Sequence, residues 1–88
     1  MILNVTYAEY KTGYKVLLSF NNGESIIVDL EDVLLEDSRK IFFPLRDLEY
    51  FKRFKLGLNT ITWDNEADFA PEYLLELGKQ QESVKSIG

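Results

Sequence analysis

The residues best suited to chemistry lie in one stretch near the end of the chain, Trp63–Glu72, which carries carboxylates at Asp64, Glu66, Asp68 and Glu72. Oxygen clusters of this kind can hold Mg²⁺ or Ca²⁺. The calcium-loop pattern, however, needs a glycine at its sharp turn and a Glu at its twelfth position, and this stretch fits neither register. A small-ligand or divalent-metal site in the loop stays an alternative, and we expect no cofactor.

A structural role explains the same residues more simply. Asp64 and Asn65 can form a turn through side-chain bonds to nearby backbone N–H groups, and Asp68 or Ala70 can cap a helix that begins at Pro71. Carboxylates that face outward would instead form an acidic surface for a basic partner, which an exposed tryptophan would anchor. The candidate partner-binding residues are therefore Trp63, Asp64, Asn65, Glu66, Asp68, Glu72 and Arg46.

Two groups of basic residues give further signals. Arg46 could clamp a carboxylate through both guanidinium N–H edges, although a structural ion pair is the simpler interpretation. The segment 50–55 interleaves aromatic and basic residues, as some nucleic-acid-binding surfaces do. An amphipathic segment with Phe51 and Phe54 inside and the cations in water explains it better.

Composition excludes several classes of chemistry. The chain of 88 residues has no cysteine and no histidine, which excludes disulfide scaffolds, thiolate zinc sites and Ser-His-Asp triads. Its 10 Lys+Arg against 15 Asp+Glu give a net charge of −5, which makes nucleic acid an unlikely partner. The sequence has no apolar run long enough to span a membrane, and we expect a cytoplasmic, non-catalytic protein.

The hydrophobic pattern predicts one α+β domain over residues 1–78 and a polar, flexible tail over 79–88. Three strands form an antiparallel meander, with Asn21-Asn22-Gly23 as the second turn. A helical turn follows, and then a helix that begins at Pro44. A short strand pair that ends at Trp63 comes next, and Gly78 stops the last helix. The expected bounds are 2–10, 14–20 and 24–29 for the strands, 30–35 and 44–53 for the helices, 54–56 with 60–63 for the strand pair, and a last helix from 71.

The same pattern predicts that the helices pack on one face of the sheet. The helical residues expected at this contact are Leu45, Leu48, Phe51, Leu74 and Leu77. The sheet residues opposite them are Val16, Leu18, Phe20 and Ile27. An uncovered sheet edge would be a natural place for a partner strand or for a homodimer.

Four blocks in this order resemble the family known as domain of unknown function 2442. They are Phe20-Asn21-Asn22-Gly23, then Asp29-Leu30, then Phe43-Pro44-Leu45-Arg46-Asp47 with Phe51, and last Trp63-Asp64-Asn65, Asp68, Ala70-Pro71-Glu72 and Leu74. The resemblance implies a short bacterial protein with a small α+β fold and no established enzymatic activity. It also implies a gene beside that of another small protein, similar to a toxin–antitoxin pair. Some members are fused to a helix-turn-helix domain, and we expect no such domain after Gly78 here.

We therefore expect a non-catalytic protein-interaction module, antitoxin-like or regulatory, whose partner is a basic protein encoded nearby. The net charge, the acidic run and the gene arrangement of the family together motivate this hypothesis.

Overall fold

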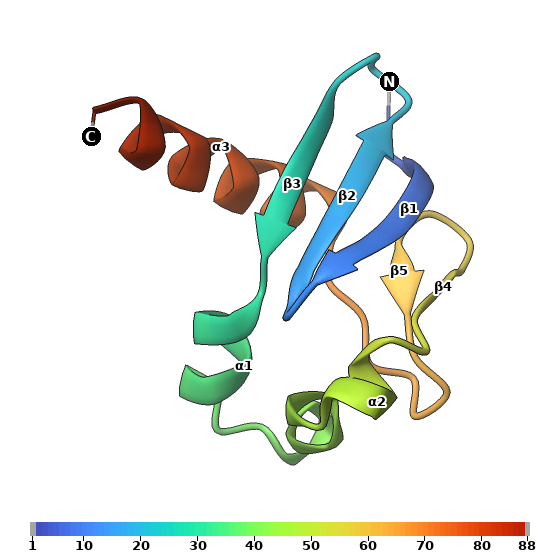
Figure 1. The fold of residues 1–88 in the computed structure, drawn as a ribbon. Helices are drawn as coiled ribbons and strands as arrows, with labels where there is room; N and C mark the ends of the chain where they lie inside the picture. The colour runs from blue at the N-terminus through green and yellow to red at the C-terminus, as the bar shows by residue number, and fades with distance from the viewer. Residues whose placement is uncertain (1, 88) are drawn as a thin grey trace.

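A three-stranded antiparallel sheet forms the centre of the fold (Figure 1). The computed structural model describes residues 2–87, with side chains for residues 2–82, so Gly88 of the expected tail lies outside the described residues. The strands are β1 (Val5–Thr12), β2 (Lys15–Phe20) and β3 (Ser25–Asp29), in the spatial order β1-β2-β3. Gly23 closes the second hairpin at a φ of 89°, a value that glycine adopts without strain. The predicted α+β meander is confirmed.

Three short helical segments follow the sheet. They are α1 (Glu31–Glu36), the 3-10 helix η1 (Lys40–Arg46) and α2 (Leu48–Phe51). The predicted helical turn at 30–35 is confirmed as α1. The single helix predicted over 44–53 is wrong, because Pro44 lies inside η1 and Asp47, with a ψ of 118°, separates η1 from α2. The Asp47 side chain accepts a bond from the backbone N–H of Glu49 and so begins α2 as a new helix.

A small strand pair and a long helix complete the chain. Strands β4 (Lys55–Leu56) and β5 (Ile61–Thr62) pair antiparallel, as the sequence predicts. Helix α3 (Pro71–Ile87) packs against β3 and passes behind the sheet in Figure 1. The expectation that Gly78 ends this helix is wrong, because the helix continues to Ile87. The domain boundary at residue 78 stays a prediction.

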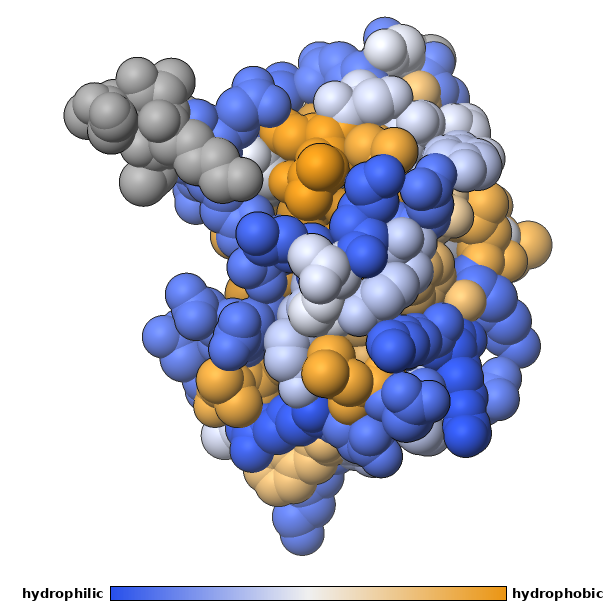
Figure 2. Space-filling model, viewed as in Figure 1, coloured by the Kyte–Doolittle hydropathy of each residue, from blue (hydrophilic) through white to orange (hydrophobic). Residues whose placement is uncertain are grey.

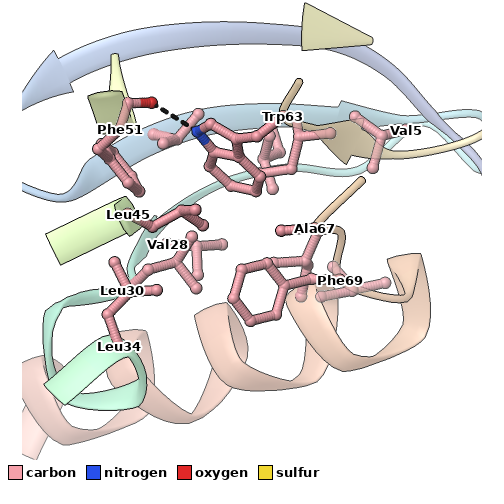
Figure 3. Packing of buried hydrophobic residues seen from close by; sticks show 14 of the residues in the cluster. Val5, Val28, Leu30, Leu34, Leu45, Phe51, Trp63, Ala67 and Phe69 are labelled. Atoms are coloured by element: carbon pink, nitrogen blue, oxygen red, sulfur yellow. Dashed lines mark hydrogen bonds between the residues drawn. The ribbon is translucent and has the colours of Figure 1, made fainter. Parts of the chain in front are cut away.

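The core lies between the sheet and α3, with Trp63 near its centre (Figure 3). Val16, Leu18 and Phe20 face it, as predicted. The prediction fails for Ile27, which is exposed, because β3 pairs Leu18 with Ile26 and Val16 with Val28. Residues opposite one another on paired strands share a face, so Ile26 and Val28 are the buried ones and Ile27 points outward.

The helical half of the predicted core is mostly confirmed. Leu45, Phe51 and Leu74 are fully buried, and Leu77 is partly buried. Leu48 is exposed, because the break at Asp47 shifts the helical phase between Leu45 and Leu48.

Gly78 has a packing role in the middle of α3. A Cβ at this position would lie 2.9 Å from Cγ2 of Ile26 and 3.1 Å from Cγ2 of Val28. Glycine therefore lets the helix approach the sheet closely, even though it weakens the helix itself.

Gly78→Ala is expected to lower the free energy of unfolding by about 1–2 kcal/mol, because the strain of overpacking exceeds the helix preference of alanine. Urea unfolding followed by circular dichroism measures the change, with the exposed Gln80→Ala as control, expected within about 0.5 kcal/mol of the parent. A Gly78→Ala protein that is more stable than the parent would contradict the close packing of α3.

Candidate binding site: an acidic pocket beside an aromatic stack

Trp63 belongs to the core. Its side chain is 2% exposed, and its indole Nε1–H donates to the backbone oxygen of Phe51 at 2.9 Å (Figure 3). The rings of Phe51, Phe54 and Phe69 surround it at centroid distances of 5.7, 6.4 and 6.1 Å. The indole has no free face for a partner, so the condition for its role as an anchor, an exposed side chain, is not met.

The turn after Trp63 is closed by main-chain and amide groups. The backbone N–H of Trp63 donates to the Ala67 oxygen, and that of Glu66 donates to the Trp63 oxygen. The side chain of Asn65 accepts from the Ala67 N–H at 3.1 Å and donates to the Ile41 oxygen at 2.8 Å. The predicted turn-forming role therefore belongs to Asn65. Its side chain is engaged in these two bonds.

The four carboxylates of the loop are exposed, and the turn leaves them outside its hydrogen bonds. Asp64 faces Lys55, with Nζ and Oδ1 3.3 Å apart. The first helical bond of α3 runs from the Leu74 N–H to the Ala70 oxygen, which places the cap at Ala70 and excludes the alternative at Asp68. Glu66 has a φ of 70°, in the left-handed region that glycine and asparagine prefer.

Glu66 and Asp68 line one side of an open pocket of about 460 Å³. The pocket lies between the α1–η1 region and the start of α3, so segments that are far apart in the sequence form it together. Its aromatic residues form a stack in which Phe42 and Phe69 are 5.0 Å apart and Phe69 and Tyr73 are 6.1 Å apart. We call this the acidic pocket, and we define it by Asp37, Arg39, Phe42, Glu66, Asp68, Phe69 and Tyr73.

An internal ion pair neutralises part of the pocket. Arg39 Nη2 lies 2.7 Å from Asp37 Oδ2, and the Arg39 guanidinium lies over the Phe42 ring at 4.7 Å. The hydrogen bond from the Arg39 side chain is the largest cause that lowers the pKa of Asp37, to about 2. Glu66 and Asp68 form no ion pair with any residue in the described part of the chain. They supply the uncompensated negative charge of the pocket.

Arg46 has a structural role that neither interpretation of the sequence anticipates. Its Nε donates to the Leu34 oxygen at 2.8 Å, and its Nη2 donates to the oxygens of Leu35 and Asp37 at 3.1 and 3.3 Å. The guanidinium also lies 4.4 Å from the centre of the Phe43 ring. Arg46 therefore joins η1 to the C-terminal end of α1, where a cation is favourable, and it clamps no carboxylate.

The structure thus brings together two of the predicted loop carboxylates and separates the other two. Asp64 and Glu72 lie outside the acidic pocket, while Glu66 and Asp68 join Asp37 within it. These three carboxylates line one pocket but do not form a metal-ligand group, and no such group of three occurs among residues 2–87, so the metal alternative loses its geometric basis. Sequence reasoning missed Arg39, Phe42, Phe69 and Tyr73; the only local signal is the i, i+4 spacing of Phe69 and Tyr73.

The basic segment 50–55 lies apart from the acidic pocket. Lys52 pairs with Glu49 at 3.4 Å and lies over the Tyr10 ring at 5.3 Å, and Lys55 pairs with Asp64. Phe51 is buried and Phe54 partly buried, as the amphipathic interpretation predicts. Arg53 is exposed between them.

The structure is a small α+β domain with an open acidic pocket on its surface. Residues 5–80 match the family described as "Protein of unknown function (DUF2442)", and the chain belongs to that family. No curated protein matches it. Among solved structures it is similar to a protein from Nitrosomonas europaea ATCC 19718 that is named a putative DNA binding protein, with a TM-score of 0.75 and 23% identity over 94% of this chain.

That comparison corrects one expectation. The match covers 53% of the Nitrosomonas protein, so this chain spans about half of that protein's length. The net charge led us to expect nucleic acid as an unlikely partner, and a structural neighbour with such a name removes this exclusion. Within residues 2–87, none of the helices has both the length and the apolar composition of a membrane span.

Trp63→Phe is expected to lower the free energy of unfolding by about 2 kcal/mol, because it leaves a cavity and removes the indole hydrogen bond. The Phe51 oxygen keeps a bond from the Phe54 N–H at 3.3 Å, which limits the loss. Urea unfolding measures it, and Leu58→Ala, at a fully exposed side chain, is the control, expected within about 0.5 kcal/mol of the parent. Equal stabilities of Trp63→Phe and the parent would contradict the buried indole.

Arg39→Gln is expected to raise the pKa of Asp37 from about 2 toward its ordinary 3.8, although the backbone N–H of residue 39 still lowers it. The pKa of Asp37 is lower in the folded than in the unfolded state, so the Arg39–Asp37 pair stabilises the fold fully at pH values above the unfolded pKa. This contribution disappears as pH falls through about 2. An NMR titration of the Asp37 carboxyl carbon measures the change. An unchanged midpoint would show that Arg39 does not hold this carboxylate.

Proposed function

We propose that the chain is a non-catalytic protein-interaction module, in which the acidic pocket receives a lysine or arginine side chain of a basic protein. The observation that carries this proposal is the position of Glu66 and Asp68 beside the stacked rings of Phe42, Phe69 and Tyr73. The module would act by occupying a basic surface of its partner, in the manner of an antitoxin or a regulatory subunit.

The chemistry of the pocket suits a cation. Carboxylates form charge-assisted hydrogen bonds with ammonium and guanidinium groups, and aromatic faces attract the same groups. Arg39 already lies over Phe42 in this way, whereas Tyr73, at the other end of the stack, is 44% exposed. The exposed ring and the two carboxylates thus offer a second cation the contacts that Arg39 makes inside the chain.

Two further features support a functional site that is not catalytic. Glu66 keeps a backbone conformation that costs a non-glycine residue about 1–2 kcal/mol, and such strain is typical of functional positions. Both carboxylates are exposed, whereas catalytic acids and bases usually lie in a pocket that excludes water.

NMR titration of the ¹⁵N-labelled protein with N-acetyl-arginine amide tests the proposal. We expect chemical-shift changes at Phe42, Asp68 and Tyr73, and an affinity reduced at least about tenfold in the double variant Glu66→Gln, Asp68→Asn. The matched control is Asp64→Asn, Glu72→Gln, which removes the same charge outside the acidic pocket and is expected to bind as the parent does.

Equal losses in both double variants would show that net charge alone attracts the ligand, and would contradict a specific pocket. A separate titration with duplex DNA tests nucleic-acid binding as the alternative. A DNA complex whose shift changes centre on Lys52, Arg53 and Lys55, together with no response to N-acetyl-arginine amide, would replace the proposal with nucleic-acid binding.

A further inference from the structure

The two edges of the sheet differ in how the rest of the chain covers them. Strand β1 forms one edge, where the backbone N–H of Val5 donates to the Asn59 oxygen at 2.9 Å and β4 packs alongside. Strand β3 forms the other edge, and no strand of residues 2–87 lies beyond it. Uncovered edges of this kind are templates for pairing with another chain.

The hydrogen-bond pattern shows which groups of β3 point away from the sheet. At the two ends of the β2–β3 hairpin, Phe20 N–H donates to the Glu24 oxygen and Leu30 N–H donates to the Tyr14 oxygen. Bonded positions alternate along an antiparallel pair, so the even-numbered residues of β3 bond to β2. The N–H and C=O groups of Ser25, Ile27 and Asp29 therefore face outward.

One of these three positions already has a partner. The side-chain amide of Gln81, on α3, accepts from the Asp29 N–H at 2.9 Å and donates to the Asp29 oxygen at 2.8 Å. Gln81 thus imitates the backbone of a neighbouring strand. Across the described part of the chain, nothing pairs in this way with the outward groups of Ser25 and Ile27.

A groove of about 920 Å³ runs along this edge, between β3, α1 and α3. Helix α3 continues past the edge of β3, so it would lie on the core-facing side of a strand added at this edge (Figure 1). Figure 2 shows apolar surface over the same part of the sheet, where the groove includes Leu17 and the exposed Ile27. Its acidic residues outnumber its one lysine, Lys15; they are Asp29, Asp32, Glu36 and Glu82.

We infer that the β3 edge binds an extended segment of the basic partner as a fourth strand of the sheet. The side chains of an added strand alternate between the two faces of the sheet. One set would lie beside Leu17 and Ile27, which favours apolar residues. The other set would lie over α1 and α3 near Asp32, Glu36 and Glu82, which favours lysine and arginine.

This inference rests on the proposed function, because it concerns the same basic partner. The groove and the acidic pocket adjoin, since Val33 and Tyr73 line both. One partner segment could pair with β3 and place a cation in the pocket beyond Tyr73. A second copy of this chain fits the groove less well, because two-fold symmetry would bring the same acidic groove against itself.

Ile27→Pro tests the strand pairing directly. Proline removes the outward N–H of residue 27, which the sheet does not use, and proline is tolerated at such positions of edge strands. The probe is the amidated, acetylated peptide Lys-Val-Lys-Val-Lys-Val, measured by calorimetry. We expect Ile27→Pro to weaken binding at least tenfold and the control Ile27→Val, which keeps the N–H, to bind within about twofold of the parent.

A second pair of variants tests the charge of the groove and does not depend on tolerance of proline. Asp32→Lys, Glu36→Lys changes two exposed positions and is expected to reverse the preference from the lysine peptide to its Glu-Val counterpart. Loss of the lysine peptide in Ile27→Pro but not in Ile27→Val supports strand addition. Equal binding to the parent, Ile27→Pro and the charge-reversed protein overturns it.

Three other outcomes also overturn the inference in defined ways. A dimer of the parent in analytical ultracentrifugation that Ile27→Pro dissociates would assign the edge to a second copy. Duplex DNA that competes with the lysine peptide for the groove would assign it to nucleic acid. An intact response of the acidic pocket to N-acetyl-arginine amide, with no peptide effect at β3, would remove the inference and leave the proposed function standing.

Discussion

The hydrogen bond from the Trp63 indole to the Phe51 backbone is the interaction on which the rest of the structure depends. It joins the end of β5 to the end of α2 inside an apolar cluster, where an unpaired N–H would be costly. Phe51, Phe54 and Phe69 close around the ring, so one side chain joins the end of α2, the start of β4 and the segment before α3. A chain of this size has a small core, and few residues can hold its parts in register.

Burial of Trp63 also determines which loop residues face solvent. The turn that follows is closed by the backbone of Trp63 and Ala67 and by the side chain of Asn65. Phe69 packs on the indole, and the Thr60 hydroxyl donates to the backbone oxygen of Phe69 at 2.5 Å, which fixes Phe69 in place. Glu66 and Asp68 lie between these packed residues, so their side chains face solvent beside the end of α1 and the start of η1.

The two surfaces that remain follow from how this small fold covers its sheet. Helix α3 shields one face and Gln81 satisfies a single outward position of β3, while the Asn59 segment covers β1. The result is an asymmetric domain, with a protected edge on one side and an acidic, partly apolar edge on the other. The family is one of unknown function, and the charge of both surfaces indicates which ligand chemistry to test first.

Local signals predicted the elements well. The meander, α1 and the β4–β5 pair follow from alternation, from Asn21-Asn22-Gly23 and from short apolar spacing. The prediction errors occur where the local sequence is compatible with two different structures. Ile26, Ile27 and Val28 are consecutive apolar residues, so only pairing with β2 decides which of them is buried. Pro44 can start an α-helix or lie within a 3-10 helix, and the break at Asp47 decided the phase of Leu48.

The sequence by itself determined the fold class, the order of elements and the excess of acid, because these depend on composition and on short-range periodicity. Only the tertiary structure decided that Trp63 is core, that Gly78 serves close packing, and that Glu66 and Asp68 share a pocket with Asp37 and Tyr73. Such facts depend on contacts between separate segments of the chain, from 12 residues apart for Trp63 and Phe51 to 52 for Gly78 and Ile26. The spacing of residues along a chain carries no record of which distant surface they will meet.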